Sequence, residues 1–159
     1  MGRALSRFAT VVVLAVAALG AVFLVGMRRK SPAVQGAVRR TSRAMKPLAM
    51  RTAGQPGAYA SVIHHVGRSS GRGYRTPIVA EAVEGGFVIA LPYGTTTDWL
   101  RNVLSAGSAT LVADGTTYTV DRPEVLALSE AGELFPADTQ RTLRLFRVEE
   151  CLRVRVVTG

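Results

Sequence analysis

Residues 64–78, HHVGRSSGRGYRTPI, form a stretch rich in arginine and glycine whose chemistry suits an anionic ligand. Arginine guanidinium groups bind phosphate or carboxylate through paired N–H donors. Glycine lets the backbone turn its amides inward on the same anion. No Asp or Glu precedes Glu81, so no acidic residue in the stretch neutralises Arg68, Arg72 or Arg75. The stretch predicts an anion-binding loop, and the alternative is a solvated basic turn between two strands.

Residues 67–71 also match G-x-S-x-G, the pattern around the nucleophilic serine of α/β-hydrolases. That chemistry requires a helix after the serine and a later histidine, whereas His64 and His65 both precede it. The Gly-Lys-Ser/Thr of a P-loop is absent too, so the sequence favours neither hydrolase chemistry nor nucleotide hydrolysis. No carboxylate or cysteine stands near the histidines. We therefore expect no metal site, and predict that one of the two histidines lines a pocket.

Charge is distributed unevenly along the chain. The net charge is +9, and residues 1–80 hold thirteen Lys and Arg but no Asp or Glu. A basic half of this kind predicts an anionic partner: phospholipid, nucleic acid or a polyanionic small molecule. The only cysteine is Cys151, which excludes an intrachain disulfide and a cysteine-based metal site. Redox chemistry would therefore depend on a bound cofactor.

Residues 8–27, FATVVVLAVAALGAVFLVGM, carry no charge and have the length of about 20 residues that crosses a bilayer as a helix. The alternative, a cleaved signal peptide, normally has a shorter apolar region. Basic residues concentrate after the run, which predicts a single-pass membrane protein whose following domain is cytoplasmic. We expect residues 1–30 to be the transmembrane anchor. Residues 31–58 should form a basic amphipathic helix and linker that contacts anionic membrane lipids.

From residue 59 onward, the sequence consists of short runs rich in β-forming residues. Asp114-Gly115 is a strong hairpin signal between the runs 108–113 and 116–122. Residues 97–106 read as a short helix with Thr97 as N-cap and Gly107 as its stop, and residues 136–146 read as a second helix. Residues 59–159 are therefore predicted to be a mostly β domain, a compact barrel of about six antiparallel strands with short helices.

Trp99 and Asn102 are three residues apart on the first of these helices, and so share one face. A tryptophan taken alone is more often a core residue than a cofactor contact. The preceding segment, ALPYG (90–94), could approach a planar ring through its backbone, because Gly94 has no side chain to block it. The two segments together predict a wall of a binding site.

Four blocks, HVGRSSGRGYRTP, VIALPYG, DWLRNVLSAGSATLV and ECLRVRVV, resemble in order and spacing the deazaflavin-dependent nitroreductase family of actinobacteria, over residues 59–159. The resemblance implies an α+β, mostly β, split β-barrel of the FMN-binding type that binds the deazaflavin coenzyme F420. It also implies an oxidoreductase that passes a hydride from the reduced cofactor to a small electrophilic or quinone-like acceptor. In such enzymes the cofactor carries the chemistry, while the protein supplies binding and orientation.

The same resemblance implies roles for individual residues. The loop would cradle the phosphate and acidic tail of the coenzyme, and the ALPYG segment would run along its ring. The implied cofactor contacts are Arg68, Ser69, Ser70, Gly71, Arg72, Arg75, Thr76, Pro77, Ala90, Pro92, Trp99 and Asn102. Tyr74, Tyr93 and His65 are the candidates to orient a substrate or donate a proton. Ser69 stands where the family commonly has Lys or Arg, and Asp98 stands where many relatives have proline.

Three alternatives remain open at the level of sequence. A related barrel could bind FMN, whose single phosphate suits the same loop. A basic module could bind nucleic acid through GRSSGRGYR, but Tyr74 is its only aromatic residue, so we expect no nucleic-acid partner. A barrel of this type could also sequester the coenzyme without catalysis. A dimer is the expected oligomeric state.

Overall fold

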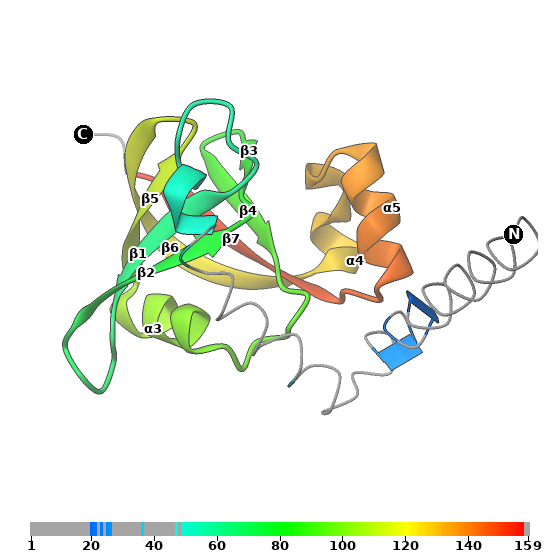
Figure 1. The fold of residues 1–159 in the computed structure, drawn as a ribbon, viewed down its shortest axis with the longest axis horizontal. Helices are drawn as coiled ribbons and strands as arrows, with labels where there is room; N and C mark the ends of the chain where they lie inside the picture. Colours follow the sequence, from blue (N-terminus) through cyan, green and yellow to red (C-terminus); the bar gives the residue numbers. More distant parts are fainter. Residues whose placement is uncertain are drawn as a thin grey trace, which may run out of the picture. The chain divides into compact units, whose positions relative to one another are not determined.

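The computed structural model describes residues 49–157 and, before them, positions 20, 21, 23, 25, 26, 36 and 47. The chain divides into two compact units, Met1–Arg40 and Thr41–Gly159. The second unit holds one antiparallel sheet of seven strands in the order β2-β1-β5-β6-β7-β4-β3 (Figure 1). The strands are β1 (Ser61–Val66), β2 (Gly73–Ile78), β3 (Glu81–Val83), β4 (Gly86–Ala90), β5 (Ser108–Ala113), β6 (Thr116–Ala127) and β7 (Glu150–Val156). The helices are α3 (Asp98–Ala106), α4 (Leu128–Ala131), the 3-10 helix η1 (Gly132–Leu134) and α5 (Ala137–Leu145). The prediction of a mostly β, antiparallel domain with short helices is confirmed.

The prediction of a single-pass membrane protein with a cytoplasmic barrel is corrected here. Among the described residues, no helix is both long enough and apolar enough to cross a bilayer. A crossing needs about 20 apolar residues in one helix, whereas α3 and α5 have nine residues each. The predicted span, residues 8–27, and most of the predicted amphipathic helix after it lie outside the described residues, although residues 49–52 are helical.

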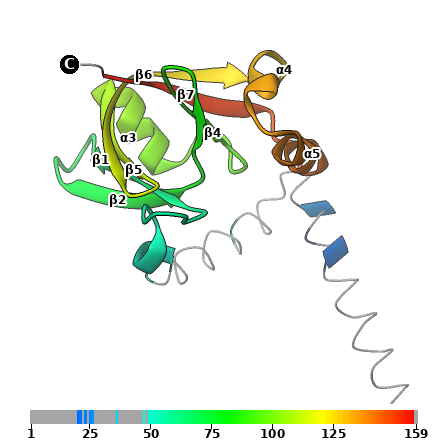
Figure 2. The ribbon, with the colours of Figure 1, turned by 90° about the horizontal axis from the view of Figure 1, so that it is seen from above.

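The sheet curls around α3, which fills its concave side (Figure 2). Side chains on a strand alternate between its two faces, and the inward set is strongly apolar. Ile63, Leu111 and Val120 from β1, β5 and β6 are fully buried there. Leu100 and Val103 of α3 are equally buried and pack into the same core. The helix ends at Gly107, whose φ of 70° is the left-handed conformation that glycine adopts without strain.

A second apolar cluster lies on the outer face of β4 and β7. Val88 alternates with Phe87 and Ile89 along β4, so it points away from α3 and is fully buried among α4 and α5 residues. Phe135 and Leu143 cover it from the helical side. The short helices therefore seal the convex face at one end of the sheet, as Figures 1 and 2 show.

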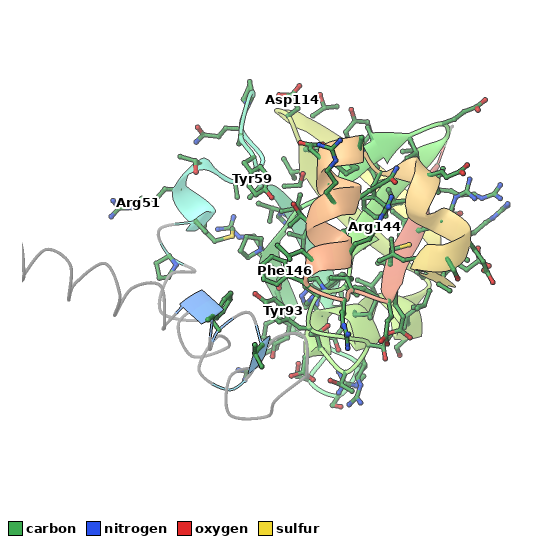
Figure 3. The ribbon with its side chains drawn as sticks, turned by 90° about the vertical axis from the view of Figure 1, so that its right-hand side faces the viewer. Arg51, Tyr59, Tyr93, Asp114, Arg144 and Phe146 are labelled. Carbon is green, nitrogen blue, oxygen red and sulfur yellow. The ribbon has the colours of Figure 1, made fainter. Side chains whose placement is uncertain are left out.

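The predicted hairpin at Asp114-Gly115 forms between β5 and β6, and both residues have positive φ. The segment before β1, predicted as a linker, is bonded to this hairpin. The Gly57 amide donates to Asp114 Oδ1 at 2.6 Å, and the Gly115 amide donates to the Gly54 carbonyl at 2.7 Å. Asp114 is labelled at the hairpin tip in Figure 3. Residues 52–58 thus form part of the folded domain.

β6 continues five residues beyond the predicted run, to Ala127. Its pairing with β7 is irregular between Asp121 and Glu124, where Arg122 has φ 48°. Pro123 lies in that interval and has no N–H to donate to a neighbouring strand, which explains why the ladder breaks there. The strand resumes and leads directly into α4, which the sequence did not predict.

Candidate functional site

The predicted anion-binding loop is a tight turn between β1 and β2. The Gly67 amide donates to the Arg72 carbonyl, and the Gly71 amide donates to the Gly67 carbonyl, both at 2.8 Å. Gly71 has φ 66°, which favours glycine. Ser69 and Ser70 lie at the exposed outer end of the turn. Because the turn joins two antiparallel strands, its serines lack the strand-to-helix setting of a hydrolase nucleophile.

Close packing explains the glycine at position 67. A Cβ there would collide with Ser70 Oγ and would lie 2.7 Å from Cε2 of Tyr74. Ser70 Oγ and Tyr74 Oη are 3.1 Å apart and share a hydrogen bond. The Tyr74 ring stacks on the His65 ring, with centroids 5.8 Å apart. The turn is therefore folded back on the aromatic pair that follows it.

A buried amide connects the turn to α3. Asn102 is 5% exposed, and its Oδ1 accepts from the Arg68 amide at 3.1 Å and from Arg68 Nη1 at 2.9 Å. Asn102 Nδ2 lies 3.1 Å from Nδ1 of His65, which is 7% exposed. His65 Nε2 lies 3.1 Å from Thr76 Oγ1. Four predicted site residues, from β1, the turn, β2 and α3, thus form one hydrogen-bonded network.

Asp98 supplies the carboxylate that the loop itself lacks. Its Oδ1 is 3.1 Å from Arg68 Nη2, and its side chain is 81% exposed. The stretch 64–78 itself has no acid, but the first residue of α3, 30 positions later in the chain, reaches Arg68. The sequence showed Asp98 only as a departure from the family pattern.

Arg75 does not share a face with this network. In the β1–β2 ladder His65 pairs with Tyr74, and His64 pairs with Arg75. Because neighbouring residues on a strand point to opposite faces, Arg75 projects away from Tyr74 and Thr76. Pro77 lies on the same face as Arg75. Arg72, in contrast, lies exposed in the turn itself.

The ALPYG segment begins at Ala90, the last residue of β4, and leads toward α3. Ala90 packs against the outer cluster, whereas Leu91 packs in the inner core. Pro92 is exposed and Tyr93 is half-buried, and Figure 3 labels Tyr93 in the loop. Trp99, in the first turn of α3, is partly buried and packs against the inner core. The structure therefore separates Ala90 from the face that carries His65, Arg68 and Asn102.

Thr97 is a site feature that the sequence identified only as a helix cap. Its Oγ1 is buried and has no hydrogen-bond partner among the described residues, and it makes no capping bond to α3. A buried hydroxyl without a partner is costly, so it marks a place where a ligand or water can bond. It lies at the start of α3, next to Asp98.

A cavity of about 310 Å³ lies elsewhere, between α4, η1 and α5. Leu128, Gln140 and Arg144 are among the residues that line it, and Arg144 is labelled on α5 in Figure 3. None of the predicted site residues contributes to its wall. The cavity is therefore separate from the candidate site.

Neither a known family profile nor a curated protein matches the chain. The solved structures similar to it include an F420-H2-dependent reductase, with 16% identity, coverage of 61% of this chain and 94% of that chain, and a TM-score of 0.44. They also include an F420 reductase, with 9% identity, coverage of 63% and 87%, and a TM-score of 0.43. HutZ, the heme storage protein from Vibrio cholerae, has 10% identity, coverage of 65% and 84%, and a TM-score of 0.45. Similarities at this level carry no argument about the function of this chain.

Proposed function

We propose that the domain is a split β-barrel oxidoreductase that binds coenzyme F420 and transfers a hydride from the reduced deazaflavin to a small electrophilic or quinone-like acceptor. One observation carries the proposal: the first and third of the four family-like blocks contact each other directly, through Arg68 and Asn102. Blocks far apart in sequence are thereby joined into one site, as a shared ligand-binding role requires.

The donors around the turn fit an anionic cofactor tail. Arg72 is exposed in the turn, and within the described residues its guanidinium takes part in no ion pair; Arg75 is exposed as well, but it projects from the opposite face of β2. Ser70 and Thr76 add hydroxyl donors, and the Thr97 hydroxyl, which has no partner in the described part of the chain, lies at the start of α3. Polyanionic groups bind best where several charged donors converge on them. We propose that Arg72 and the hydroxyls of Ser70, Thr76 and Thr97 hold the phosphate and carboxylate groups of the coenzyme.

In this proposal the residues divide into binding and orienting roles. When bound, the reduced deazaflavin supplies the hydride. Arg68 is already held by Asp98 and Asn102, so we assign it chiefly to fixing the turn. Tyr74 and His65 stack beside the turn and are the candidates to orient the acceptor, with Tyr93 as a third. Trp99 would border the ring side of the site.

The test is direct binding to the full-length protein. Trp99 is the only tryptophan, so its fluorescence reports ligand binding near α3. We expect coenzyme F420 to quench it saturably, and to bind more tightly than FMN because its tail carries more negative charge. Oxidation of reduced F420 by nitroaromatic and quinone acceptors, followed by visible absorbance, tests turnover. Saturable binding of FMN but not F420 would favour the flavin alternative, and binding of neither would contradict the proposal.

A further inference from the structure

The orientation of the Asn102 amide is determined by its partners. Its Oδ1 faces two N–H donors of Arg68, the backbone amide and Nη1. A reversed amide would place its own N–H groups against those donors, and arginine has no acceptor to offer. The Nδ2 group must therefore point toward His65, at 3.1 Å from Nδ1.

The amide orientation in turn determines the tautomer of His65. Asn102 Nδ2 can only donate, so His65 Nδ1 must accept with its lone pair. A neutral imidazole with a free lone pair on Nδ1 carries its hydrogen on Nε2. The Nε2–H group then donates to Thr76 Oγ1 at 3.1 Å. All the hydrogen bonds from Arg68 to Thr76 thus run in one direction.

The last group in this chain of bonds is the Thr76 hydroxyl. Its oxygen accepts from His65, so its own hydrogen is directed elsewhere. Among the described residues, the Thr76 hydroxyl has no hydrogen-bond partner other than His65. Thr76 is half-buried on β2, which is an edge strand of the sheet. The chain begins at a cation, and each bond in it polarises the next, which strengthens the final donor.

We infer that Asn102 and His65 are positioning residues which present the Thr76 hydroxyl as a hydrogen-bond donor to an anionic oxygen, phosphate or carboxylate, of the bound coenzyme. The inference rests on the proposed function for the identity of the ligand. The direction of the bonds is a property of the free protein. Thr76 would thus contact the ligand directly, whereas the buried Asn102 would act only through His65.

The direction of the bonds is tested first, in the protein without ligand. The chain has only two histidines, and His64 lies on the opposite face of β1. A ¹⁵N NMR spectrum of the His64→Gln variant therefore reports His65 alone. We expect an unprotonated Nδ1 and a protonated Nε2. Asn102→Asp places an acceptor opposite Nδ1, and we expect that nitrogen to become protonated. A protonated Nδ1 in the protein that retains Asn102 would overturn the inference.

The donor role of Thr76 is tested by F420 binding to the full-length protein. Thr76→Val removes the hydroxyl with little change of shape, and we expect affinity to fall by about tenfold or more, the scale of a lost bond to a charged group. Thr76→Ser retains a hydroxyl and should bind within about threefold of the wild type, a difference small beside such a loss. Thr119→Val removes an exposed strand hydroxyl from β6 and serves as the matched control.

The outcomes separate this inference from the proposed function. If the wild type binds F420 and Thr76→Val binds it equally well, the donor role is wrong while the proposed function stands. If the wild type does not bind F420, the proposed function and the ligand role of Thr76 both fail. Thermal melts of the Thr76 variants show whether any loss of binding reflects loss of fold.

Discussion

The pairing of Arg68 with Asp98 makes one substitution informative about charge at the site. Asp98→Asn removes a negative charge that competes with an anionic ligand for the Arg68 guanidinium. Because Asp98 is mostly exposed, we expect stability to change little and F420 affinity to rise, by about two- to fivefold. The gain should shrink at high salt, because mobile ions screen exposed charges. Titrations at low and high salt check this, and an unchanged affinity at low salt would separate Asp98 from the ligand.

Arg68 itself should matter for both folding and binding. Arg68→Ala removes the Nη1 donor from Asn102 Oδ1, whose residue is buried, and we expect the free energy of unfolding to fall by about 1–3 kcal/mol. Coenzyme affinity should fall as well, because the turn loses its side-chain bonds to Asn102 and Asp98 and keeps only the bond from its backbone amide to Asn102. Arg75→Ala is the control. Arg75 is exposed and lies on the other face of β2, so the free energy of unfolding of this variant should match that of the wild type. Denaturant unfolding distinguishes the two variants.

Cys151 provides a prediction about pH. Burial raises the pKa of the Cys151 thiol above its ordinary value of 9.0. The unfolded chain therefore loses this proton at lower pH than the folded chain, so the contribution to stability is complete below pH 9.0 and declines as pH rises further. We expect the stability difference between wild type and Cys151→Ala to shrink above that pH. Reaction with thiol reagents should be slow in the folded protein, since the thiolate is the reactive form.

At the scale of the elements, the β1–β2 turn depends on one glycine and tolerates change at another. Gly67→Ala would force a methyl group against Ser70 Oγ and the Tyr74 ring, so we expect a stability loss of about 1–3 kcal/mol and weaker F420 binding. A Cβ at Gly73 meets nothing within 4 Å, which makes Gly73→Ala the matched control. Equal melting temperatures for the two variants would show that the turn adjusts without cost.

The position of α3 inside the curled sheet gives Trp99 a structural role beside its proposed role at the site. It is partly buried against the inner core, so Trp99→Ala should lower the free energy of unfolding by about 1.5–3 kcal/mol. Leu104→Ala, at an exposed position of the same helix, should cost much less. If Trp99 also borders the cofactor, the folded variant should bind F420 more weakly. Melting curves and isothermal titration, measured on the same samples, separate the two roles.

Across the whole domain, local signals predicted local structure well. Asp114-Gly115 fixed the hairpin, and Gly107 marked the end of α3, because a positive φ favours such residues. α4 and η1 escaped prediction because four- and three-residue helices leave no periodic pattern. The shared face of Trp99 and Asn102 followed from helical spacing. The bonds of Arg68 with Asn102 and Asp98 could not be predicted in this way. They depend on how α3 packs beneath β1, which spacing along the chain does not encode.

The contact between residues 52–58 and the β5–β6 hairpin predicts where the folded domain begins. A chain that starts at residue 59, the expected boundary, lacks Gly54, Pro56 and Gly57. It thereby loses two hydrogen bonds to the hairpin and the packing of Pro56 beside Gly115. We expect it to be less stable than a chain that starts at residue 49 by about 2–4 kcal/mol, the sum of these bonds and the buried surface.

A double-mutant cycle shows whether the hairpin contact causes that difference. Asp114→Ala removes the acceptor for the Gly57 amide, but it also places alanine at φ 48°, which is strained. The strain is the same in both chains, so only the longer chain should show the additional loss from the broken bond. We expect Asp114→Ala to destabilise the chain from residue 49 by about 0.5–1.5 kcal/mol more than the chain from residue 59. Equal effects in both chains would mean that Asp114 does not hold the segment, and that the domain starts nearer residue 59.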